Sequence, residues 1–322
     1  MPVGGITLGP TPFLALGPTP FLAPRHAALA APGVPVRGSV PLRFLVLLLF
    51  AASALSASAA APRAARSREP GAVEILERAE EVRSPDIDYA GQFTLGVLDP
   101  HRPGVERKAA YTLIAHGKDC TLALMRSPPE LYGAALLIAQ GAYWFLLPRA
   151  ARALQLSGPQ VLTGDASVGD LARANLSGSY EPRLDGNDRL EGEPCWRLEL
   201  TRTRPGASYP RVRLWVARNG FLPKKAEYYG MTGSLLRVAR FMEFREGPIG
   251  LRPMKIEFED ATGAGGKTTM LFTDLRRIDA SQISFTREGM ERLREAAFGA
   301  RLSNGEGVDL DRLLAALAAG KS

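Results

Sequence analysis

The sequence of 322 residues has few of the side chains that bind metals or carry out acid–base chemistry. It holds three histidines and two cysteines, and only His101 and His116 follow the first 60 residues, without metal-ligand spacing. It has no G-x-S-x-G nucleophile elbow. Its glycine-rich segment Gly263–Gly266 does not complete a phosphate-binding loop. Helix capping and a solvated face explain Asp165 and Asp170, so we expect no enzyme, no metal and no cofactor.

Basic blocks with interleaved aromatic residues are also absent. The formal net charge is +7, but the first 60 residues contribute three arginines and no acid, which leaves +4 for the rest. This excess is modest and dispersed, so we expect no nucleic-acid binding. After residue 60 no segment is long and apolar enough to span a bilayer.

The beginning of the chain has the features of an export signal. Two arginines precede the apolar run Phe44–Leu55, which is too short to span a bilayer comfortably, and Ala57–Ala59 is an A-x-A cleavage site. We therefore expect a signal peptide over residues 37–59, cleaved near Ala59, and a soluble periplasmic protein if the source is Gram-negative. An uncleaved anchor is the alternative.

The segments on either side of this signal are expected to be unstructured. Residues 1–36 repeat LGPTPFLA and are rich in proline and glycine, which indicates either a recognition arm or a mis-annotated translation start. Residues 60–70 form a basic linker. Export permits a disulfide between Cys120 and Cys195, but two separate core thiols would fit the sequence equally well.

The stretch Tyr209–Phe244 gives the clearest structural pattern. Three runs alternate apolar and polar residues, and turns at Asn219-Gly220 and around Gly230 separate them. In the first run Val212, Leu214 and Val216 share one side. This period of two predicts an antiparallel meander with one face on a core and one in water.

Further strands are predicted on both sides of this meander, with a turn at Asp185–Asn187. Helical spacing predicts helices over residues 71–83, after a cap at Asp165, after a cap at Thr286, and over residues 310–319. About ten antiparallel strands are too many for a flat layer, so the sheet is expected to curl.

Several segments resemble one bacterial family. They are PRAARALQL (148–156), GDASVGDL (164–171), CWRLEL (195–200), the run from Tyr209 to Arg237, and FTREGMERL (285–293). Their order over residues 71–293 is similar to that of the outer-membrane lipoprotein-sorting proteins of the LolA-like superfamily.

The resemblance implies an α+β fold, a half-open antiparallel β-barrel whose concave face is covered by helices. We expect this domain over residues 71–298, followed by a tail with a short helix over residues 299–322. The resemblance further implies a monomeric periplasmic carrier that holds lipoprotein acyl chains or another lipid. An inner-membrane transporter and an outer-membrane acceptor would be its partners.

Apolar residues in the predicted strand rows are the candidate lining of the lipid cavity, although ordinary core packing explains any one of them. A charge in such a row is costly unless it is paired, so Arg240 could meet a lipid head group or pair with an acid such as Asp260. The candidates are Phe93, Leu95, Leu113, Leu122, Leu124, Trp196, Leu198, Leu214, Val238, Arg240, Met242, Phe244, Ile256 and Phe258.

Three other functions fit the same fold. An envelope-stress sensor would use the half-barrel to detect mislocalised lipoproteins. An accessory protein would serve a transporter of the resistance-nodulation-division type. A structural envelope protein would have a filled core and no extractable lipid.

Overall fold

The computed structural model describes most of the chain after residue 67. The described residues are 68–98, 102, 104–139, 141–156, 161–163, 166–167, 175–204, 207, 209–263, 266–302 and 308–319. The expected signal peptide, the LGPTPFLA repeats and residues 168–172 of the helix expected after Asp165 lie outside the described residues, whereas Ala166–Ser167 form a short strand. No described helix combines the length and apolarity needed to cross a membrane.

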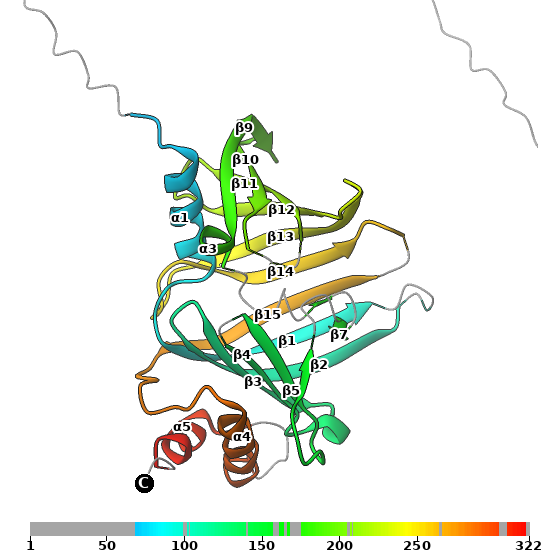
Figure 1. The fold of residues 1–322 in the computed structure, drawn as a ribbon, viewed down its shortest axis with the longest axis vertical. Coiled ribbons are helices and arrows are strands. Elements are labelled where there is room, and N and C mark those ends of the chain that lie inside the picture. The colour runs from blue at the N-terminus through cyan, green and yellow to red at the C-terminus, as the bar shows by residue number, and fades with distance from the viewer. Residues whose placement is uncertain are drawn as a thin grey trace, which may run out of the picture. The chain divides into compact units, whose positions relative to one another are not determined.

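One antiparallel sheet of thirteen strands dominates the fold, in the order β6-β5-β4-β3-β2-β1-β15-β14-β13-β12-β11-β10-β9 (Figure 1). The strands are β1 (Tyr89–Leu98), β2 (Glu106–His116), β3 (Cys120–Ser127), β4 (Ala135–Ala139), β5 (Ala142–Leu146), β6 (Leu154–Leu156), β9 (Tyr180–Leu190), β10 (Glu193–Arg202), β11 (Arg211–Ala217), β12 (Pro223–Tyr229), β13 (Leu235–Arg245), β14 (Arg252–Asp260) and β15 (Lys267–Arg277). Two short strands, β7 (Val161–Thr163) and β8 (Ala166–Ser167), form a separate hairpin.

The predicted α+β fold with a curled, unclosed antiparallel sheet is confirmed. Residues of β4 and β14 line one hollow although four strands separate them in the sheet, so the sheet bends strongly. The predicted count of about ten strands was too low, because short segments such as the three residues of β6 form strands of their own. Strands β11, β12 and β13 form the predicted meander.

The larger of the hydrophobic clusters lies on the concave face. Helix α1 (Ala72–Arg83) covers part of this face, and its residues Ile75, Leu76 and Ala79 belong to the cluster. The predicted alternation in β11 holds, since Val212, Leu214 and Val216 are also members. The short helix α3 (Leu176–Ser179) packs beside α1.

Helices α4 (Arg287–Gly299) and α5 (Leu310–Ala319) pack on the opposite face of the sheet, over β3–β5 (Figure 1). The reason is visible in β3, where residues 121–125 are all buried and so both faces of the strand need cover. Leu122 and Leu124 pack there with Leu293 and Leu313. Thr286 caps α4 as predicted, with its Oγ1 accepting from the Gly289 N–H at 3.1 Å.

The predicted turn at Asp185–Asn187 was wrong. Strand β9 runs through this segment, and the turn to β10 is made by Glu191 and Gly192. Gly186 has a φ of 116°, and the pairing between β9 and β10 is irregular there, so the segment is a bulge within the strand. A glycine that permits such a bulge gives the same sequence signal as a turn glycine.

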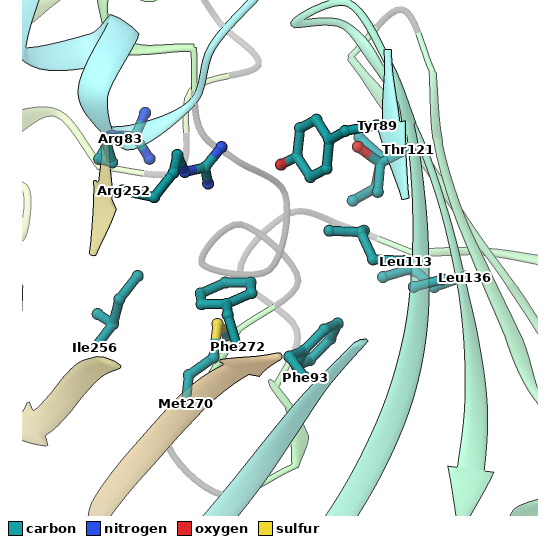
Figure 2. A pocket seen from close by; sticks show the side chains of 12 residues that line it. Arg83, Tyr89, Phe93, Leu113, Thr121, Leu136, Arg252, Ile256, Met270 and Phe272 are labelled. Atoms are coloured by element: carbon teal, nitrogen blue, oxygen red, sulfur yellow. The ribbon is translucent and has the colours of Figure 1, made fainter. Parts of the chain in front are cut away.

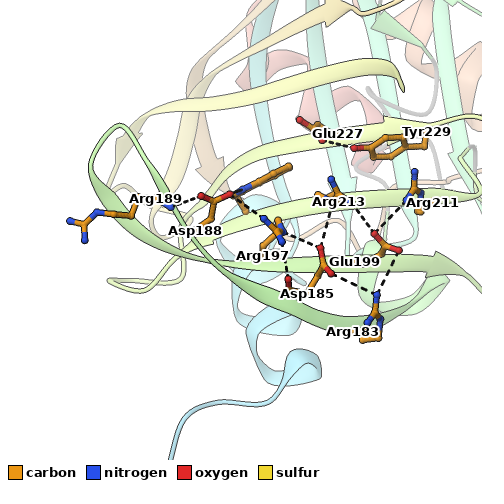
Figure 3. Close-up of polar contacts among 11 residues, drawn as sticks. Arg183, Asp185, Asp188, Arg189, Arg197, Glu199, Arg211, Arg213, Glu227 and Tyr229 are labelled. Carbon is orange, nitrogen blue, oxygen red and sulfur yellow. Dashed lines mark hydrogen bonds and ion pairs between the residues drawn. The ribbon is translucent and has the colours of Figure 1, made fainter. Parts of the chain in front are cut away.

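The outer face of β9–β11 carries a dense array of charges (Figure 3). Glu199 pairs with Arg213 at 3.4 Å, with Arg211 at 3.5 Å and with Arg183 at 4.0 Å. Arg197 donates to Asp185 at 3.0 Å. We call these residues the outer network. It matches the predicted water-facing side of the sheet.

The two cysteines are separate free thiols. Cys195 packs with Trp215 and Ala217 in a small third cluster, while Cys120 begins β3. Burial raises the pKa of both thiols above the ordinary value. The sequence left open either a disulfide or two separate thiols, and the structure shows separate thiols.

Candidate functional site

A hollow that we call the main hollow lies on the concave face, where the two halves of the curled sheet approach each other (Figure 2). It contains about 530 Å³ of empty space, part of which is open to solvent. Its described lining is Arg83, Tyr89, Phe93, Leu113, Thr121, Ala123, Leu136, Ile138, Arg252, Ile256, Met270 and Phe272.

A second hollow adjoins the first along β3 and β4. It holds about 540 Å³ of empty space, again partly open, and shares Ala123 and Leu136 with the main hollow. Its other described lining residues are Tyr111, Met125, Leu131, Ala134, Phe145 and Leu147. The two hollows therefore form neighbouring parts of one apolar surface, which follows the concave side of β3 and β4.

Aromatic side chains separate and support these hollows. Phe93 stacks on Tyr111 with ring centroids 4.7 Å apart and planes 7° apart, and it also contacts Phe272 at 5.8 Å. Phe93 and Phe272 line the main hollow, while Tyr111 lines the second. Rings held against each other in this way present a fixed apolar wall.

Polar groups gather at one end of the main hollow. Figure 2 shows Arg83, Arg252, Tyr89 and Thr121 at this end, and Phe93, Met270 and Phe272 at the other. We call the first group the polar end. Arg252 comes from the start of β14, and its guanidinium carbon lies 5.2 Å from the centre of the Tyr89 ring.

Glu80 links the polar end to α3 through an ion pair and hydrogen bonds. Its carboxylate is 2% exposed, pairs with Arg83 at 3.1 Å, and accepts hydrogen bonds from the backbone N–H groups of Leu176 and Ser177 at 2.5 Å and 2.7 Å. Three donors therefore satisfy one buried carboxylate, which is the condition for burying its charge without a large penalty. The same contacts join α1 to α3.

Three of the predicted cavity residues, Phe93, Leu113 and Ile256, line the main hollow. Six more belong to the larger hydrophobic cluster or pack against it, on the concave side, but are not among the described lining of the two hollows. These six are Leu95, Trp196, Leu198, Leu214, Phe244 and Phe258.

The other five predicted residues lie away from the hollows. Leu122 and Leu124 pack under α4 and α5. Val238, Arg240 and Met242 alternate along β13 with Ala239 and Phe241, which belong to the concave cluster, so these three face the outer side. Phe244 packs with the concave cluster after Glu243, whose φ of 55° interrupts the alternation.

Arg240 is an exposed, paired side chain. Its Nη1 atom lies 2.8 Å from Glu259 Oε2, and the two side chains are 44% and 55% exposed. An ion pair was one of the two readings given by the sequence, with Asp260 as the example partner. The observed partner is the residue before Asp260, because Glu259 and Arg240 face the same side of neighbouring strands.

The buried arginine of the hollow was missed by sequence reasoning. Arg252 lies two residues before Met254, in the row that Met254, Ile256 and Phe258 continue, so the period of two could have placed it on the concave face. Arg83 gave no comparable signal, because the last turn of a surface helix commonly carries an arginine.

Comparisons with known proteins agree with this architecture. The profile of a family described only as uncharacterised proteins matches residues 117–292, more than half of the chain. No curated protein matches.

Solved structures give closer matches. A LolA superfamily protein from Nitrosomonas europaea has 30% sequence identity and a TM-score of 0.63, over 68% of this chain and 99% of that one. A DUF1329 family protein from Desulfovibrio piger has 18% identity and a TM-score of 0.61, over 68% and 97%. A domain from Vibrio parahaemolyticus, assigned as an outer membrane lipoprotein-sorting protein, has 16% identity and a TM-score of 0.59, over 69% and 98%. The chain belongs to the LolA superfamily.

Proposed function

We propose that this protein is a periplasmic carrier that binds the acyl chains of a lipoprotein, or another lipid, in the hollows of its concave face. The observation that carries the proposal is the partly empty apolar surface, which side chains from β1 to β4, β14 and β15 enclose without filling. Transfer of a lipid requires shielding of its hydrocarbon from water, and each buried CH₂ contributes about 0.8 kcal/mol.

The family membership supports this reading. The Vibrio parahaemolyticus domain, which shares the fold, is assigned to lipoprotein sorting. Under the proposal the exported protein receives its cargo at the inner membrane and delivers it to an acceptor at the outer membrane. Catalysis is not needed for such a transfer, which depends only on relative affinities for the lipid.

Lipid analysis of the native protein tests the proposal directly. Protein purified from the periplasm is expected to release lipid into organic solvent, in roughly equimolar amount, as measured by mass spectrometry. Well-folded protein that releases no lipid would contradict it.

Two matched variants then test whether the hollow is the binding surface. Ile256→Gln and Met242→Gln change half-buried residues on paired strands, but Ile256 lines the main hollow and Met242 faces the outer side. Ile256→Gln is expected to weaken binding of a fluorescent fatty acid about tenfold, because loss of apolar contact of this size costs about 1.5 kcal/mol. Met242→Gln should leave the affinity unchanged. Equal affinities in both variants would remove the binding site from this face.

A further inference from the structure

The polar end of the main hollow has a buried positive charge that the fold does not match. Arg252 is only 4% exposed, and its Nε and Nη1 atoms have no hydrogen-bond partner among the described residues. Its contact with the Tyr89 ring is a cation–π interaction, which leaves the N–H groups without acceptors. A guanidinium buried in this state is strongly unfavourable until an acceptor reaches it.

The nearby acid does not provide that acceptor. Glu80 already receives Arg83 and two backbone N–H groups. Among the described residues at this end, one carboxylate and two guanidinium groups leave an excess of one positive charge. An anion with two or more oxygen atoms would satisfy the fork of Arg252 and neutralise that charge.

The rest of the hollow determines what such an anion carries. The polar end and the apolar wall formed by Phe93, Met270 and Phe272 belong to the same hollow, at opposite ends (Figure 2). A free inorganic anion would pair with the polar end but would leave the apolar wall without a ligand. An amphiphile with an anionic head and a hydrocarbon tail matches both.

We propose that Arg252, with Arg83 beside it, binds the phosphate or carboxylate of an anionic amphiphile whose tail lies on the Phe93–Phe272 wall. This inference rests on the proposed lipid carriage and specifies its ligand class. It predicts selectivity by charge: a neutral head would leave Arg252 without an acceptor, at a cost comparable to a missing hydrogen bond to a charged group.

Three ligands that differ in one part each provide the test. They are 1-palmitoylglycerol 3-phosphate, 1-palmitoylglycerol, which lacks the phosphate, and glycerol 3-phosphate, which lacks the tail. Their affinities for the delipidated exported protein are measured by displacement of a fluorescent fatty acid and by calorimetry. The protein is compared with Arg252→Gln and with Arg240→Gln, which changes the exposed arginine that pairs with Glu259 on the outer face.

The unmodified protein is expected to bind the phosphorylated lipid at least about tenfold more tightly than 1-palmitoylglycerol. Arg252→Gln should lose most of this preference and still bind 1-palmitoylglycerol, which also shows that the variant is folded. Arg240→Gln should keep the preference. Glycerol 3-phosphate should bind far more weakly than either lipid.

Each contrary result has a distinct meaning. Equal affinity of the unmodified protein for both lipids, or a preference that survives in Arg252→Gln, would overturn the inference and leave lipid carriage standing. Binding of neither lipid would overturn the proposed function, and this inference with it. Tight, Arg252-dependent binding of glycerol 3-phosphate would overturn the assignment of the site to an amphiphile.

Discussion

Arginines on the two faces of the sheet differ in their exposure and in their pairing with carboxylates. On the outer face, Arg213 and Arg197 are about 30% exposed and pair with Glu199 and Asp185. On the concave face, Arg252 is almost fully buried, and two of its nitrogen atoms have no acceptor among the described residues. In the outer network Arg213 and Arg197 both have carboxylate partners, although the Nε atom of Arg213 has no hydrogen-bond partner among the described residues. We infer that an anion entering the hollow matches the concave arginine.

The largest loss of stability is expected from a change at Glu80, whose buried carboxylate accepts from Arg83 and from two backbone N–H groups. Glu80→Gln keeps the shape of the side chain but places an NH₂ group where N–H groups now donate, and it removes the charge partner of Arg83. We expect a loss of about 3 kcal/mol in the free energy of unfolding. Chemical denaturation measures this loss.

The control for Glu80 is Glu74 on the same helix. Its ion pair with Arg78 is 3.9 Å long and both side chains are more than half exposed, so Glu74→Gln should change stability very little. If both variants lose the same small amount of unfolding free energy, burial of the Glu80 carboxylate does not increase its contribution to stability.

A gain of stability is expected when the unmatched charge is removed. Arg252→Met replaces a buried guanidinium by an apolar side chain that can line the hollow, and it should raise the free energy of unfolding of the delipidated protein by about 1–3 kcal/mol. Thermal and urea unfolding without added lipid or phosphate provide the measurement. A destabilised Arg252→Met protein would indicate that the arginine is matched within the fold.

The smallest expected effect concerns an outer-face carboxylate and depends on pH. Burial alone would raise the pKa of Glu257, but hydrogen bonds from Lys267 at 2.6 Å and Lys255 at 3.1 Å outweigh it and lower the pKa below the ordinary value. A carboxyl group with a lowered folded-state pKa stabilises the protein above its unfolded pKa, near 4.3, and this contribution is lost as the pH falls through the lowered value.

Glu257→Gln should therefore reduce stability by up to about 1 kcal/mol at pH 7, and the difference from the unmodified protein should shrink as the pH falls below the unfolded pKa near 4.3. Urea unfolding at pH 7 and pH 3.5 tests this. A difference that grows in acid would show that the two lysines do not control the carboxylate.

The sequence predicted the face of a residue well wherever the strands are regular. Alternation in β11 placed Val212, Leu214 and Val216 on the concave side. The arginines of the opposite row, Arg211 and Arg213, belong to the outer network. The same rule applied to β13 selected Val238, Arg240 and Met242 as the inner row, whereas Ala239 and Phe241 occupy it. Alternation defines two rows, and a small inner residue such as Ala239 makes the rows hard to distinguish by hydrophobicity.

The remaining differences depend on long-range packing. Leu122 and Leu124 look like cavity residues in the sequence, but α4 and α5, which follow them by more than 150 residues, cover that face. The unmatched state of Arg252 also cannot be inferred from the sequence, because it depends on which acids from other elements reach it. Glu80 pairs with Arg83 at the polar end, and its carboxylate also accepts hydrogen bonds from the backbone of α3.

The sheet ends in β6 on one side and β9 on the other, and its strand order does not join them. In a closed barrel, strand number and stagger together set the diameter. No such closure condition applies to this open sheet, and the twist between successive strands varies within a range among proteins. Under the proposed function we therefore expect a bulkier guest to be accommodated by a slight unrolling of the sheet, with the hydrogen bonds between its strands kept.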